Sequence, residues 1–141
     1  LAGVYAMVAT EVAARGPACW ASGRCCNFRQ AGHRLYVTGL EGAYALRGAP
    51  AAGARDIALI QLRAAGALER CPFLDGNACG IHTIKPLACR TYFCDGATRE
   101  WQQELTERGL REVRALHDGF GLEYRYAEWG WVIGLLRASA G

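Results

Sequence analysis

Long apolar runs are missing from this sequence of 141 residues. No stretch reaches the roughly 20 apolar residues that span a bilayer, and no signal-peptide pattern is visible near the first residue, Leu1. We therefore expect no membrane association and a cytoplasmic location. Because the chain begins with leucine, a removed leader stays open as an alternative.

The common catalytic motifs are also missing. The sequence contains no P-loop, no G-x-S-x-G nucleophile elbow, no H-E-x-x-H motif and no G-x-G-x-x-G motif. Nothing in the sequence distinguishes one cysteine as the nucleophile of a Cys–His pair. We expect a protein that is not an enzyme on its own.

Lysine is scarce, since Lys85 stands beside fifteen arginines in a chain of net charge +3. This bias, together with abundant alanine and glycine, is typical of a GC-rich bacterial genome. The arginines of residues 97–118 share their segment with acidic residues, which predicts a solvated face and not a nucleic-acid site. We expect a protein partner of unidentified kind.

Cysteine, by contrast, is abundant and clustered. One group comprises Cys19, Cys25 and Cys26, and a second comprises Cys71, Cys79, Cys89 and Cys94. An odd total of seven does not suit a complete set of disulfides, and clustered cysteines in a cytosolic protein more often bind metal. We predict a metal centre that joins the two groups, with disulfides or metal-free redox thiols as the alternatives.

Local signals place several of these cysteines in loops. The turn-forming segment Asp-Gly-Asn lies between Cys71 and Cys79, which predicts a tight hairpin that brings the two thiols together. The neighbours Cys25 and Cys26 point in different directions, so they suit two ligand roles.

A short helix is predicted within residues 85–94. Pro86 suits its first turn, and about two helical turns would place Cys89 near Cys94. Arg90 follows Cys89 directly and is a candidate to donate hydrogen bonds to cofactor sulfur or thiolate. A surface ion pair is the alternative role for Arg90.

These motifs resemble a known family. The matching residues are Cys71-Pro72-Phe73-Leu74, Cys79-Gly80-Ile81, Lys85-Pro86, and Cys89-Arg90 followed by Tyr92. Their order is similar to that of the CxxCxxCC (YkgJ-like) cysteine-cluster family, a zinc- or iron-chelating domain. The resemblance covers about residues 18–95 and implies a metal-binding role.

Three residues depart from the family pattern. Ser22 stands at the position of the second cysteine in CxxCxxCC, His82 replaces a tyrosine and Lys85 replaces an arginine. The resemblance therefore implies fewer than eight thiol ligands. His82 either restores a ligand or fills an aromatic position.

The predicted metal ligands form one set. They are Cys19, Cys25, Cys26, Cys71, Cys79, Cys89, Cys94 and His82. The positions that match the family most firmly are Cys25, Cys26, Cys79 and Cys89. His33 and His117 are expected to be surface or packing residues.

The identity of the metal is predicted less directly. No C-x2-C pair is present, and the spacing of Cys89 and Cys94 suits zinc and some ferredoxins alike. Nearby aromatic residues that would shield a cluster favour an iron–sulfur centre, such as 4Fe–4S, which serves a partner in electron transfer, sensing or scaffolding. The alternative is a zinc-stabilised interaction module, and a thiol-redox enzyme is the third hypothesis.

The fold is predicted to be mainly α-helical, as a single domain over residues 1–141 with irregular cysteine loops. Helices are expected at 2–15, 38–47, 54–65, 97–118 and 123–138, the last as a helix or as an aromatic strand turning into one. Thr38 and Glu41 have the spacing of a capping box. The expected core residues are Trp101, Leu105, Leu110, Val113 and Leu116 in the first of the two C-terminal helices, and Trp129, Trp131, Ile133, Leu135 and Leu136 in the second.

Overall fold

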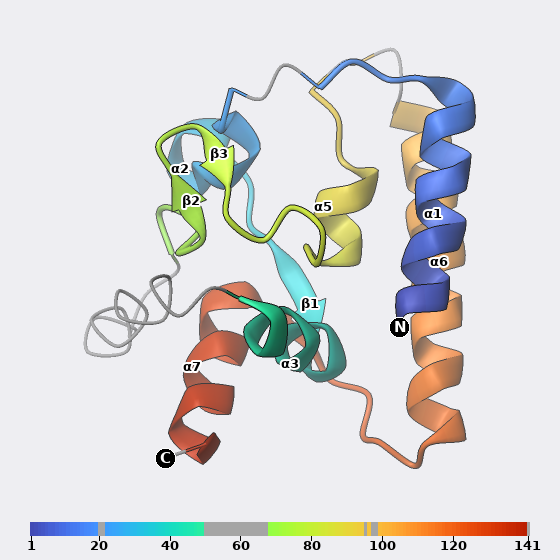
Figure 1. Ribbon diagram of the computed structural model, residues 1–141, viewed down its shortest axis with the longest axis vertical. Helices are drawn as coiled ribbons and strands as arrows, with labels where there is room; N and C mark the ends of the chain where they lie inside the picture. Colours follow the sequence, from blue (N-terminus) through green and yellow to red (C-terminus); the bar gives the residue numbers. More distant parts are fainter. Residues whose placement is uncertain (20–21, 50–67, 95, 97–98, 141) are drawn as a thin grey trace.

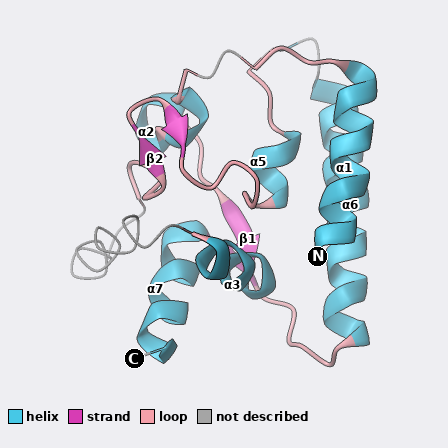
Figure 2. Cartoon of the chain, viewed as in Figure 1, coloured by secondary structure: helices cyan, strands magenta, loops and turns pink. Residues whose placement is uncertain are grey.

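The computed structural model describes residues 1–19, 22–49, 68–94, 96 and 99–140. Helices predominate in this part of the chain, as Figure 2 shows, so the mainly α-helical prediction is confirmed. The helix predicted at 54–65 lies outside the described residues. None of the described helices is long and apolar enough to cross a membrane.

One side of the molecule is a pair of helices, α1 (Ala2–Arg15) and α6 (Arg99–Gly119), which lie side by side (Figure 1). α1 ends where predicted, because Gly16 takes a left-handed conformation at φ 58° and its N–H bonds back to the carbonyl of Val12. Tyr5, Val8, Leu87, Leu105 and Val113 form the buried core between these elements.

The predicted apolar stripe of α6 is confirmed in part, since Leu105 and Val113 are buried. Its buried residues are Leu105, Gly109, Val113 and His117, which recur every four residues. Leu110 and Leu116 are only partly buried. The absence of a side chain at Gly109 allows Leu87 to pack closely there, since a Cβ would lie 2.6 Å from Leu87 Cδ1. A small residue thus sets the packing face, which a search for large apolar residues overlooks.

The other side is built from α3 (Gly39–Gly48) and α7 (Trp129–Ala140), which are joined by a short antiparallel ribbon. Strand β1 (Tyr36–Thr38) pairs with β4 (Tyr126–Glu128), and each strand is followed directly by its helix. The alternative of an aromatic strand turning into a helix is therefore confirmed.

α7 buries one face against this ribbon and α3. Trp129, Val132 and Ile133 have exposed fractions of 0%, 4% and 2%, whereas Trp131 and Leu135 are 50% and 49% exposed. The prediction that Trp131 and Leu135 belong to the core is wrong. The helical spacing of i, i+3 and i+4 places them on the other face of α7.

Between the two sides lies α5 (Leu87–Thr91), which is shorter than predicted. It ends because the side chain of Gln102 on α6 binds the backbone that follows Thr91. Gln102 accepts a hydrogen bond from the N–H of Phe93 at 3.1 Å and donates one to its carbonyl at 3.3 Å. The prediction of two helical turns is wrong, and Cys94 lies beyond the helix that carries Cys89.

A buried carboxylate joins three of the helices. Glu41, 1% exposed, completes the predicted capping box with Thr38 at the start of α3. Its other oxygen accepts hydrogen bonds from the backbone N–H of Leu87 at 2.9 Å and from the hydroxyl of Tyr5 at 3.5 Å. Glu41 therefore fixes α5, and with it Cys89, against α1 and α3.

Candidate metal centre

The first cysteine loop is a tight helical turn. The 3-10 helix η1 (Arg24–Cys26) is followed by α2 (Phe28–Ala31), which the Asn27 side chain caps by accepting from a backbone N–H. Cys25 is exposed and Cys26 is half-buried against the main apolar core. The turn thus presents two adjacent thiols in different environments.

The second loop contains the predicted hairpin. Strands β2 (Leu74–Asp75) and β3 (Ala78–Cys79) pair in antiparallel fashion, and the turn between them includes Gly76 at φ 56°. Cys71, which precedes the hairpin, is buried, and Cys79 at its end is half-buried. The short turn brings Cys79 back towards Cys71.

Backbone contacts hold the two loops together. The N–H of Cys71 donates to the carbonyl of Cys26 at 2.7 Å, and the N–H of Arg29 donates to the carbonyl of Glu69 at 3.0 Å. The side chains of Arg29 and Glu69 form an exposed ion pair at 3.0 Å. Figure 1 shows the result, with α2 beside β2 and β3.

Gly23 is expected to be essential for this close approach. Its φ is +68°, and a Cβ there would lie 3.1 Å from the Cα of Asn77 in the hairpin turn. Gly23→Ala is expected to cost about 1–3 kcal/mol in free energy of unfolding, because backbone strain and the contact add. Denaturant titration measures this. Gly32→Ala is the control, since Gly32 has φ +69° but open space around it; an equal loss in both variants would contradict the contact.

Cys26 lies in the middle of the thiols. Its thiol lies within hydrogen-bond reach of Cys25, Cys71 and Cys79, and this raises its own pKa. The interaction with Cys26 is the first cause that lowers the pKa of Cys25 and Cys79 to about 6, and it lowers the pKa of Cys71 as well. Cys26 therefore keeps its proton while its neighbours favour the thiolate form, which is the form that binds metal.

Cys89 reaches the same group from α5. Part of the residue stays accessible to solvent, but burial of its thiol raises its pKa, and the negative charges of Cys71 and Cys79 raise it further. A thiol with this preference is neutral until a cation arrives. Five of the predicted ligands thus come together from three separate segments of the chain.

Two residues without a predicted role in the centre support it. Lys85 opposes the rise in the pKa of Cys89, and its positive charge also favours the thiolates of Cys25 and Cys79. His33 places its Nε2 atom 2.9 Å from the carbonyl oxygen of Cys25, which braces the first loop. A lysine close to a cysteine cluster in the sequence indicates charge compensation. No sequence pattern indicates the contact of His33 with Cys25.

The donors suit a metal that prefers sulfur. Within the described ranges, no three histidine, cysteine, aspartate or glutamate side chains already surround a common point as ligands. The Cys26 thiol lies among the other thiols and favours its protonated form, so metal binding through it must displace this proton. Thiolate sets of this kind select zinc or iron and not magnesium or calcium. The residues present therefore fit such a metal.

Three predicted ligands lie outside this group. Cys19 and Cys94 are exposed. His82 is exposed too, its Nε2 atom lies 3.4 Å from Lys85 Nζ, and the charge of Lys85 lowers its pKa. Ser22, which stands where the family pattern has a cysteine, accepts a long hydrogen bond of 3.4 Å from the N–H of Arg24. As ligands, Cys19, Cys94 and His82 remain predictions.

Arg90 is occupied by the fold. Its guanidinium donates to the carbonyls of Lys85 and Thr83, both at 2.8 Å, and stacks 3.9 Å from the ring centre of Tyr5. These contacts tie the loop before α5 to α1. They support a positioning role for Arg90, while its predicted contact with a cofactor remains a prediction.

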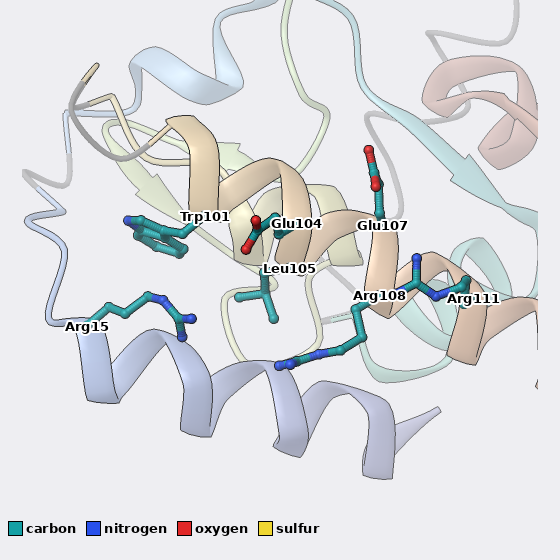
Figure 3. A pocket seen from close by; sticks show the side chains of 7 residues that line it. All are labelled: Arg15, Trp101, Glu104, Leu105, Glu107, Arg108 and Arg111. Carbon is teal, nitrogen blue, oxygen red and sulfur yellow. The ribbon is translucent and has the colours of Figure 1, made fainter.

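A cleft between α1 and α6 is made without cysteine (Figure 3). Its lining residues are Arg15, Trp101, Glu104, Leu105, Glu107, Arg108 and Arg111. Glu11 pairs with Arg108 at 2.7 Å and with Arg15, so the charges beside the cleft hold the two helices together. The thiol group is therefore the stronger candidate for function.

Comparison with known proteins agrees with this geometry. Residues 18–107 match the model of the CxxCxxCC family, described as "Putative zinc- or iron-chelating domain". The match spans more than half of the chain, so the protein belongs to this family, and the resemblance read from the sequence is confirmed. No curated protein and no solved structure gave a significant match.

Proposed function

We propose that this member of the CxxCxxCC family binds metal through cysteines contributed by both loops and by α5. The proposal rests on one observation, the placement of the Cys26 thiol within hydrogen-bond reach of Cys25, Cys71 and Cys79. Crowded thiolates repel one another, and a cation makes such a gathering favourable. The single positive charge of Lys85 does not neutralise the negative charges of several thiolates.

Five thiols exceed the needs of one four-coordinate site. Cys26, Cys71, Cys79 and Cys89 are buried or half-buried and supply four sulfur ligands. Cys25 is exposed, so it is the thiol that solvent or a partner protein reaches first. We propose that the fifth thiol serves exchange of metal or contact with the partner, at the outer edge of the centre.

An iron–sulfur cluster is the first candidate for the bound group. All five donors are sulfur. The aromatic residues Phe28 and Phe73, each 4% exposed, exclude water from the side of the thiol group that faces the core. When bound, such a cluster supplies one-electron transfer. This suits a module that serves a partner protein by electron transfer, sensing or scaffolding, in the cytoplasm, where thiols stay reduced.

Zinc is the second candidate, and the hairpin favours it. β2 and β3 contain two residues each, and a two-stranded hairpin is marginally stable in water by itself. A structural ion that ties this hairpin to the first loop would stabilise both. In that case the protein is an interaction module without catalysis.

The experiment is metal and sulfide analysis of the full chain purified without oxygen, together with its visible absorption spectrum. Iron with equimolar acid-labile sulfide and a broad band near 400 nm, roughly as thiolate-ligated clusters show, would establish the cluster. Zinc without colour would establish the second candidate. Fresh protein that contains no metal, and whose thiols are free or paired as disulfides, would contradict the proposal and favour thiol-redox chemistry.

A further inference from the structure

Trp129 is the first residue of α7 and lies beyond the segment matched by the family model, residues 18–107. It is fully buried, and its backbone N–H donates to the carbonyl of Leu35 at 2.9 Å. Its ring packs on Phe73, with centroids 5.8 Å apart. The fold thus fixes this indole at the inner wall of the second cysteine loop.

The indole N–H of Trp129 is buried and has no hydrogen-bond partner, sulfur included, among the described residues. A buried donor without a partner is costly, so we expect it to gain an acceptor when the centre is occupied. Cys71 belongs to the same buried cluster of side chains. After Cys26, the Trp129 side chain is also among the groups that lower the pKa of Cys71, so it lies close to that sulfur.

We infer that Trp129 is a positioning residue of the metal centre, whose indole N–H donates a hydrogen bond to the sulfur of Cys71 and orients that sulfur for metal binding. The inference rests on the proposed function. A thiolate that accepts such a bond is held in one orientation and gives up less electron density to its metal. Hydrogen bonds to ligand sulfurs tune both affinity and spectroscopy.

The test uses Co²⁺ as the probe, because its thiolate charge-transfer bands report electron density on sulfur. In the full chain, Trp129→Phe keeps an aromatic ring and removes the N–H. We expect roughly tenfold weaker Co²⁺ binding, in the range usual for residues that orient ligands. We also expect a charge-transfer band at longer wavelength, because the Cys71 sulfur becomes more electron-rich.

Trp131→Phe is the matched control, since Trp131 lies two residues away and is half-exposed. Its affinity and band should equal those of the wild type. A benzothienyl-alanine residue at position 129 replaces only the N–H by sulfur, so it separates the hydrogen bond from packing if Trp129→Phe folds poorly.

The outcomes are distinct. A band shift in both variants at position 129, and none in Trp131→Phe, supports the inference. Weaker Co²⁺ binding without a band shift in the variants at position 129 would show that Trp129 only packs against the centre, and would overturn the inference. A wild-type protein that takes up no Co²⁺ would overturn the proposed function, and the inference with it.

Discussion

Cys26→Ser is expected to remove most of the bound metal and to loosen both cysteine loops. Cys26 is the thiol that contacts three others, so its loss opens the middle of the centre, and a serine hydroxyl is a poor ligand for zinc or iron. If four thiolates share the about 10–16 kcal/mol typical of structural zinc, losing one weakens affinity by roughly a hundredfold to a thousandfold. Competition with a chromophoric chelator measures this affinity.

Cys94→Ser is the matched control for this variant. Cys94 is an exposed cysteine that follows α5, and the described thiol contacts do not include it. We expect Cys94→Ser to keep the metal content and thermal stability of the wild type. Full metal in Cys26→Ser, or an equal loss in Cys94→Ser, would contradict the five-thiol assignment and return Cys94 to the ligand set.

Features fixed by neighbouring residues could be predicted from the sequence. The capping box of Thr38 and Glu41, the glycine stop after α1 and the hairpin turn at Gly76 each depend on a few consecutive residues, and each is present. The end of α5 could not be predicted, because it depends on the side chain of Gln102, which belongs to another helix.

The candidate site shows the same division. The sequence indicates which residues have metal-binding chemistry, and the family pattern ranks Cys25, Cys26, Cys79 and Cys89 first. The backbone hydrogen bond from Cys71 to Cys26 brings the second loop to the first across 45 residues of chain (71 − 26), and no local pattern predicts it. Periodicity alone places Trp129 in the core, but the direction of its N–H depends on tertiary packing.

The largest loss of stability is expected at Glu41, although it is not a thiol. Its carboxylate accepts from the N–H and hydroxyl of Thr38 at 2.9 and 3.1 Å, and from Leu87 and Tyr5. Glu41→Gln keeps the shape but turns an amide NH₂ towards hydrogen-bond donors. Buried donors then lose their acceptor, so we expect the free energy of unfolding to fall by about 2–4 kcal/mol. Denaturant titration of the metal-loaded protein measures the change.

This loss should extend to the metal centre. The N–H of Leu87 begins α5, and Cys89 lies two residues further along it. A looser α5 presents Cys89 less precisely, so Glu41→Gln should weaken metal binding without altering any ligand. Glu112→Gln, at an exposed position on α6, is the control and should stay within about 0.5 kcal/mol of the wild type. If Glu41→Gln were equally silent in stability and affinity, Glu41 would not be the junction that connects α1, α3 and the cysteines.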